Sequence, residues 1–284
     1  MQAQLPKDPF RVISSIRQAI QNVRLDGVPD PHAYASFIKA CNKVLGIREV
    51  KATHGHVIRA GMDCDTHILN SLIHSYLGPK RFDRYASVLF DRMPIRTVVS
   101  VNCMLSGFVK NKEFDLGFGL FKRFVAGEFG LDLKPNYVTL MVLVSGCVET
   151  GEYGCQVGKL LHCYCCKTGL DVPVGVCNAL IDFYAKVGFM GLAESLFNGM
   201  VLRDLVSWNT MIAAYARSDA SRKAFSLFRE MGLGNVGYDR VSLVNLMLAC
   251  ANGRWDDVLQ ARSAMVARRA PKMAGKSFIS ELAG

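Results

Sequence analysis

The chain has 284 residues, half of them hydrophobic and 20% charged, and 34 Lys and Arg against 24 Asp and Glu give it a formal net charge of +10. This composition excludes a disordered tail. The longest apolar run, residues 138–148, is shorter than the roughly 18 residues of a membrane span, so no membrane partner is expected. The length is compatible with one or two compact domains, or with a solenoid that has no single core.

The N-terminus lacks the apolar stretch and the small-residue cleavage site of a secretory signal. The ten cysteines are therefore predicted to be reduced, buried thiols. Residues 10–25 contain Arg11, Arg17 and Arg24 and no acidic residue. Residues 1–30 can thus be an organellar transit segment or a degenerate first repeat, and both interpretations stay open.

Internal similarity dominates the rest of the chain. Residues 66–76 (THILNSLIHSY) match residues 174–184 (VGVCNALIDFY), and residues 98–108 (VVSVNCMLSGF) match residues 205–215 (LVSWNTMIAAY). Cys41, Cys147 and Cys250 mark a period of about 105 residues, which divides into three subunits each. A period of this kind predicts a solenoid of short modules.

Each module is predicted to be a pair of helices. After Asn178, the apolar residues Leu180, Ile181 and Tyr184 fall on one helical stripe, and the same offsets recur after three other Asn residues. A turn signal and a second helix with a Leu-Phe pair follow. No segment alternates with period two, so the predicted fold class is all-α, a right-handed α-solenoid without a sheet.

These motifs resemble pentatricopeptide (PPR) repeats. Residues 98–136 and 205–239 resemble the P type, residues 174–204 the short S type, and residues 31–65 and 137–173 the long L type. The order resembles the PLS subclass of land-plant organellar RNA-editing factors. The resemblance implies about seven helix-turn-helix modules: 31–65, 66–97, 98–136, 137–173, 174–204, 205–239 and a degenerate one in 240–284. The last segment departs from the pattern, and we expect a truncated relative without the C-terminal E/DYW-type domain.

Tetratricopeptide-like repeats are the main alternative, because they too are helix pairs of similar period. Their signature requires Trp, Leu-Gly and Tyr early in the repeat, whereas this chain repeats Val-x-Ser/Thr-x-Asn. Because the helix pairs and the period are shared, a helical-repeat protein–protein scaffold remains the alternative function.

The recurrent Asn is the predicted functional residue. It lies about 110° from the centre of the apolar stripe, so it need not be buried, and its amide can address the edge of an unpaired base. The alternative is that this Asn only caps or solvates its helix. The resemblance implies that it acts with the last residue of its module. The implied pairs are Ala35/Asp65, Asn70/Thr97, Asn102/Asn136, Met141/Pro173, Asn178/Asp204 and Asn209/Asp239.

In similar proteins, Asn with Asp favours uracil and Asn with Asn favours cytosine. Ala35, Met141 and Val244 lack a discriminating polar group, so the long modules are expected to act as spacers. The residue three before each Asn (Val99, Val206, less clearly His67 and Gly175) resembles the position that wedges a base, although a Val there can also be a buried core residue. The expected RNA runs, 5′ to 3′, unspecified, pyrimidine, cytosine, unspecified, uracil, uracil.

No catalytic site is expected. None of the six histidines starts an H-x-E motif, and no Pro-Cys pair exists, so the zinc site of a nucleobase deaminase is absent. Cys163 and Cys166 form a C-x-x-C without a second ligand pair, and no metal or cofactor site is predicted. The sequence thus predicts a non-enzymatic, single-stranded RNA-binding protein of a mitochondrion (alternatively a chloroplast). Its expected role is site recognition in C-to-U editing, with a separate deaminase-bearing or editing-complex protein as partner and no small-molecule substrate.

Overall fold

The structure, a computed structural model, describes residues 24–25, 28–29, 35, 38, 47–78, 83–218, 220–234 and 236–252. The chain divides into two compact units, Met1–Asp171 and Val172–Gly284. The expected transit segment, Cys41 and the tail after residue 252 lie outside the described residues, apart from Arg24–Leu25 and Val28–Pro29.

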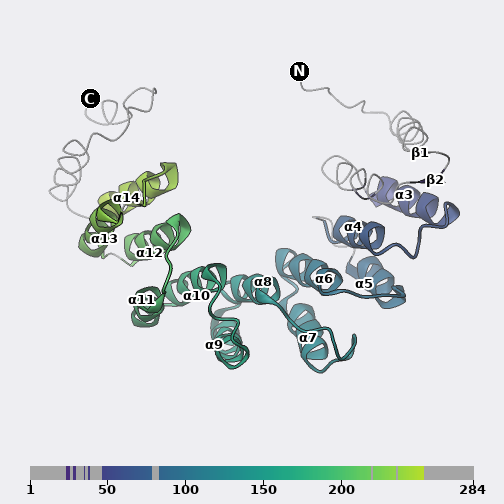
Figure 1. The fold of residues 1–284 in the computed structure, drawn as a ribbon, viewed down its shortest axis with the longest axis horizontal. Helices are drawn as coiled ribbons and strands as arrows, with labels where there is room; N and C mark the ends of the chain where they lie inside the picture. Colours follow the sequence, from purple (N-terminus) through teal and green to yellow (C-terminus); the bar gives the residue numbers. More distant parts are fainter. Residues whose placement is uncertain are drawn as a thin grey trace, which may run out of the picture. The chain divides into compact units, whose positions relative to one another are not determined.

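Helices make up almost all of the described structure (Figure 1). In the first unit they are α3 (Ile47–Arg59), α4 (Thr66–Tyr76), α5 (Asp83–Arg92), α6 (Val98–Lys110), α7 (Phe114–Val125), α8 (Tyr137–Cys147) and α9 (Gly151–Thr168). In the second they are α10 (Val174–Lys186), α11 (Met190–Gly199), α12 (Leu205–Arg217), α13 (Ser221–Leu233) and α14 (Arg240–Asn252). The predicted all-α solenoid is confirmed.

One detail of that prediction is wrong, because the described residues include a short sheet. Strand β1 (Arg24–Leu25) pairs antiparallel with β2 (Val28–Pro29). The residues between them in the sequence are Asp26 and Gly27, and Asp-Gly is a strong hairpin signal that the search for longer alternating runs does not detect.

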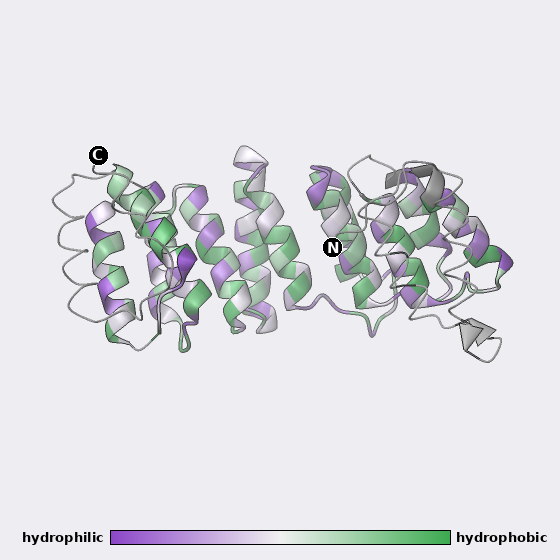
Figure 2. Cartoon of the chain, turned by 90° about the horizontal axis from the view of Figure 1, so that it is seen from above, coloured by the Kyte–Doolittle hydropathy of each residue, from purple (hydrophilic) through white to green (hydrophobic). Residues whose placement is uncertain are grey.

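Each unit consists of two rows of helices. In the first, α4, α6 and α8 pack side by side, and α5, α7 and α9 each pack against the helix before them. In the second, α10, α12 and α14 form the row, and α11 and α13 pack on it. We call the members of these rows first helices and their hairpin partners second helices. The helices carry both hydrophobic and hydrophilic residues (Figure 2), as expected for elements that bury one stripe.

The core contains the residues of the predicted stripe. Leu180, Ile181 and Tyr184 are all buried, and so are the equivalent residues of α4, α6 and α12. Short turns join the helices of a hairpin: Gly188 after α10 has φ of 86°, and Lys112 adopts φ of 62° at the corresponding turn after α6. Glycine adopts this left-handed conformation without steric cost, so Lys112 is a strained equivalent of Gly188.

Candidate nucleic-acid interface

The four recurrent Asn residues occupy one position in the fold. Asn70, Asn102, Asn178 and Asn209 are each the fifth residue of a first helix. Asn102 is half-buried, whereas Asn70, Asn178 and Asn209 have exposed fractions of only 9%, 8% and 7%. The helical stripe alone left this position free to be exposed or buried, and the structure buries three of the four side chains. The neighbouring first helix of the row covers this flank, which the stripe of a single helix does not reveal.

The partner residues at the module ends cap the following first helices. Thr97, Asn136 and Asp204 each accept a hydrogen bond from a backbone N–H three residues on, and that residue's hydroxyl accepts one in return from the N–H of the cap residue. Asp239 exchanges the same bonds with Ser242. The first-helix Asn itself is inside its helix and is not the cap.

The Ser or Thr that directly follows a Val near the start of four first helices is a structural position to which the sequence patterns above give no role. It closes these capping boxes and is fully buried at Ser100, Thr139, Ser207 and Ser242. The available signal was the spacing of a polar cap residue and a hydroxyl three residues later. The capping box fixes the backbone at the point where each module-end side chain leaves the chain.

The structure joins three of the predicted pairs. The Nδ2 of Asn102 donates to Oδ1 of Asn136 over 3.2 Å. In the second unit, Asn178 Nδ2 donates to Asp204 Oδ1 over 3.3 Å, and Asn209 Nδ2 donates to Asp239 Oδ1 over 3.1 Å. No hydrogen bond joins the described residues Asn70 and Thr97, because the short Thr97 side chain is engaged with Ser100.

Hydrogen bonds concentrate on one oxygen of each carboxylate. Asp204 Oδ1 accepts from the N–H and the hydroxyl of Ser207, both at 2.8 Å, as well as from Asn178. Burial raises the pKa of the Asp204 carboxyl, but these hydrogen bonds lower it by more. The N–H and hydroxyl of Ser242, with Asn209, likewise hold the pKa of Asp239 below its ordinary value. Both side chains are therefore ionised at neutral pH.

The side-chain amide oxygens of the Asn residues that pair with Asp are buried and have no hydrogen-bond partner. A carboxylate only accepts hydrogen bonds, so Asn178 and Asn209 must turn Nδ2 toward it. Their Oδ1 atoms, and that of Asn70, are buried and make no hydrogen bond. An unsatisfied buried acceptor costs free energy in the folded protein.

Two exposed valines flank the pairs. Val99 and Val206, three residues before Asn102 and Asn209, are 59% and 57% exposed. The alternative that they are core residues is therefore wrong. His67 is exposed and Gly175 half-buried at the same offset. An exposed apolar side chain one turn from a polar pair offers a surface against which a planar group can pack.

The remaining predicted positions do not form such pairs. Ala35 is buried, Met141 and Pro173 are half-buried, and Val244 is largely exposed. Pro173 makes no side-chain cap of α10, and Asp65 caps α4 through the N–H groups of His67 and Ile68. These positions present no polar pair in the described structure.

The lowered pKa values predict an acid-sensitive fold. Carboxyls with depressed folded-state pKa values stabilise the fold above their unfolded pKa of about 3.9, and this contribution is lost as the pH falls through the folded value. In the double variant Asp204→Asn and Asp239→Asn, Asn still caps but does not titrate. Its melting temperature should fall less between about pH 6 and pH 3 than that of the natural protein. Glu230→Gln, which neutralises an exposed carboxylate of α13, is the control and should leave the drop unchanged; an equal drop in all three proteins would contradict the assignment.

The remaining predictions concern the cysteines, metal sites and membrane spans. Of the nine described cysteines only Cys147 and Cys165 are buried, so the prediction of buried thiols is wrong for the other seven. Burial raises the pKa of Cys147 to about 12. Across the described ranges, no three His, Cys, Asp or Glu side chains are arranged to hold a metal ion. None of the described helices combines the length and apolarity needed to cross a bilayer.

Comparison with known proteins identifies the repeats. A family profile described as "PPR repeat" matches residues 99–126, 176–205 and 206–235. This chain contains pentatricopeptide repeats. Two similar proteins of Arabidopsis thaliana are the pentatricopeptide repeat-containing proteins At1g15510, chloroplastic (34% identical over 78% of this chain), and At1g59720, chloroplastic/mitochondrial (32% over 80%). This chain spans only 25% and 35% of the length of these two relatives.

Solved structures show the same fold. The pentatricopeptide repeat protein PPR10 in complex with an 18-nt psaJ RNA element is 14% identical to this chain, with a TM-score of 0.61 over 93% of this chain and 37% of PPR10. PPR10 from maize gives a TM-score of 0.59 at 16% identity, over 90% and 41% of the two chains. The fold of this chain is thus an α-solenoid like that of PPR10.

Proposed function

We propose that the PPR chain binds single-stranded RNA and reads one base per module, with the module boundaries of the sequence analysis. The observation that carries this proposal is the hydrogen-bonded polar pair that recurs in one position at Asn102/Asn136, Asn178/Asp204 and Asn209/Asp239. The RNA in the PPR10 complex supports the same ligand class. The family supports a binding role in place of catalysis.

The chemistry of the pairs supports different bases. In Asn178/Asp204 and Asn209/Asp239, the Asn Oδ1 and the carboxylate are acceptors, so the ligand must supply a donor, as uracil does through its N3–H. In Asn102/Asn136, Thr139 already donates to Asn102 Oδ1 over 2.7 Å. The Nδ2 group of Asn136 is the donor that remains, and it suits the ring acceptor of cytosine.

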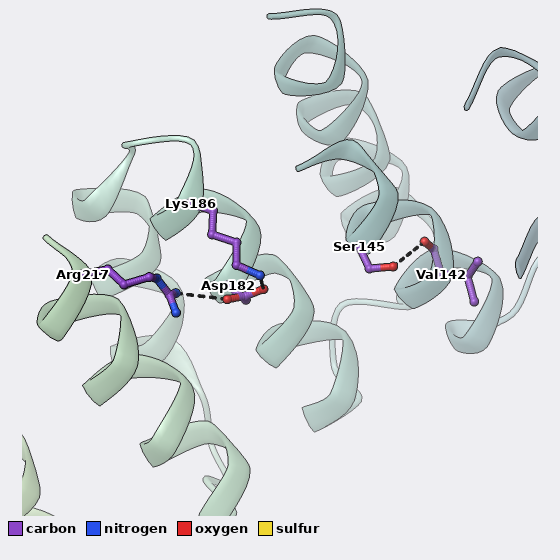
Figure 3. A network of polar contacts seen from close by, with 5 residues as sticks. All are labelled: Val142, Ser145, Asp182, Lys186 and Arg217. Carbon is purple, nitrogen blue, oxygen red and sulfur yellow. Dashed lines mark hydrogen bonds and ion pairs between the residues drawn. The ribbon is translucent and has the colours of Figure 1, made fainter. Parts of the chain in front are cut away.

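Basic residues recur in the same register. Lys110, Lys186 and Arg217 each lie eight residues after a paired Asn, at the exposed ends of α6, α10 and α12. Asp182 binds Lys186 Nζ over 2.6 Å and Arg217 Nη2 over 3.1 Å (Figure 3). One carboxylate between two cations leaves a net positive charge, which favours phosphate.

The long module of residues 137–173 lacks this arrangement of one carboxylate between two cations. Its Ser145 corresponds in register to Asp182 and donates its hydroxyl to the carbonyl of Val142 in its own helix over 2.7 Å (Figure 3). Glu149, in register with the cations, pairs with Lys112 over 3.0 Å. The long module is thus proposed to space the reading modules.

We place the proposed function in an organelle, since curated relatives are chloroplastic or mitochondrial proteins. The mitochondrion remains our choice, with the chloroplast as the alternative. The resemblance to the PLS subclass supports C-to-U editing as the process, with a separate editing-complex protein supplying the deaminase.

Fluorescence anisotropy with short labelled RNAs tests the proposal. An RNA with two uracils in register with Asn178/Asp204 and Asn209/Asp239 should bind about tenfold more tightly than the same RNA with two adenines, because a good base contact discriminates by ~1–3 kcal/mol. Duplex RNA and single-stranded DNA are the controls and should bind more weakly. Equal binding of all four nucleic acids, or of none, would contradict base reading and favour the protein scaffold.

A further inference from the structure

Arg203 connects the second helix of its module to the residue that selects the base. It immediately precedes Asp204, in the loop between α11 and α12. Its Nε donates to the carbonyl of Phe197 over 2.9 Å, and its Nη2 donates to the carbonyl of Asn198 over 3.0 Å. Both carbonyls belong to the last turn of α11, where helical carbonyls lack partners in their own helix.

Aromatic contacts strengthen this connection. The guanidinium lies 4.7 Å from the centre of the Phe197 ring and 5.9 Å from that of Trp208. The two rings meet edge to face, with centroids 5.3 Å apart. Trp208 precedes Asn209 in α12, so the cation joins the end of one helix to the start of the next. A planar guanidinium can hydrogen-bond and stack at the same time, which Lys cannot.

The capping box of Asp204 and Ser207 holds the end of this loop, but the two residues before Arg203 make no core contact that would hold its middle. Val201 and Leu202 are 97% and 73% exposed, so neither side chain anchors the loop in the core. Arg203 thus returns to the helix hairpin immediately after these two exposed residues, through its bonds to the end of α11. Asp204 is the next residue, and its carboxylate must stay within hydrogen-bond distance of Asn178 on α10.

An equivalent contact, from the residue before the module end to the Phe of the second helix, occurs in two other modules. Arg96, immediately before Thr97, donates to the carbonyls of Phe90 and Asp91 at the end of α5, and its guanidinium lies 5.3 Å from the Phe90 ring centre. Tyr238, immediately before Asp239, donates its hydroxyl to the carbonyl of Phe228 over 3.4 Å and stacks on that ring at 4.2 Å. Two different side chains therefore reach the equivalent Phe and its carbonyl.

We propose that Arg203, Arg96 and Tyr238 are positioning residues for base selection. Each ties the loop before a module-end residue to the Phe of its own second helix. In the modules of Arg203 and Tyr238, where the module-end residue is hydrogen-bonded to the Asn, this contact sets the distance between the two. The proposal rests on the proposed RNA reading. Selection requires the polar pair to be held within about 0.5 Å, so a looser loop should affect discrimination before it affects overall affinity.

The variants Arg203→Ala and Arg203→Lys test this role, in the whole 284-residue chain and with RNAs that differ only at the base facing Asn178/Asp204. A well-made base contact gives roughly 5- to 150-fold discrimination. Arg203→Ala should reduce the preference for uracil at this base by about threefold or more, while the preference at the base facing Asn209/Asp239 changes less. Arg203→Lys keeps the charge but loses the paired hydrogen bonds and the stacking, so it should lose selectivity as well.

Arg222→Ala is the matched control, because it removes an exposed cation of α13 in the same unit. It should leave both preferences unchanged. A phosphate contact by Arg203 would instead weaken all RNAs alike and reduce the salt slope by about one, which would overturn the proposal. A variant with intact circular dichroism and unchanged uracil preference would overturn it too. If the natural protein itself shows no base preference, the proposed function fails, whichever result the variants give.

Discussion

In the variant Asn209→Thr, with Asp239 unchanged, the preferred base at that module should shift from uracil toward guanine. The substitution replaces an amide, which donates to Asp239 and leaves a buried acceptor, by a hydroxyl that presents one donor in a different place. We expect a change of about tenfold or more in the ratio of the two affinities, since a base contact discriminates by ~1–3 kcal/mol. Competition binding on two RNAs that differ at this single base measures the ratio.

The neighbouring module supplies the control. Asn178→Thr carries the same substitution in an equivalent Asn/Asp pair of the same unit, so it should switch only the adjacent base. Threonine at an interior helix position costs only about 0.7 kcal/mol or less relative to the best helix former, so both variants should fold. If either substitution weakens both RNAs equally, the Asn is a packing residue and the proposed register is wrong.

A second large effect is expected at Gly154, where α9 meets the end of α8. Gly154 is buried, and a Cβ at this position would overlap the carbonyl oxygen of Cys147 and the hydroxyl of Thr150. Since a backbone carbonyl cannot rotate aside, α9 must shift away from α8. Gly154→Ala should therefore lower the free energy of unfolding by about 3 kcal/mol, measured by urea denaturation.

Gly119→Ala in α7 is the matched control. It is the same substitution inside a helix of the same unit, but nothing lies within 4 Å of the added Cβ. Alanine is favoured over glycine in a helix by about 0.8–1 kcal/mol, so this variant should be slightly more stable than the natural protein. Equal stability of the two variants would show that α8 and α9 do not pack as the structure has them.

Much of the fold follows from local sequence patterns. The stripe Leu180, Ile181 and Tyr184 predicts an amphipathic helix because its spacing is a property of one helix alone. The repeat of that stripe predicts the solenoid, since short helices must bury their stripes against neighbours. The pairing of Asn178 with Asp204 followed from a family resemblance, and the structure places the two in hydrogen-bond contact.

Tertiary structure decided the environment of each candidate residue. Asn178 is buried because the next helix of its row covers the flank that its own stripe leaves open, and Val206 is exposed although its residue type suggests a core position. The hydrogen bond from Arg203 to the carbonyl of Phe197 depends on the loop that brings the end of α11 close to the start of α12. Periodicity describes which face of a helix is apolar, whereas burial and hydrogen bonding depend on the neighbour that packs there; only the stacked helices supply that neighbour.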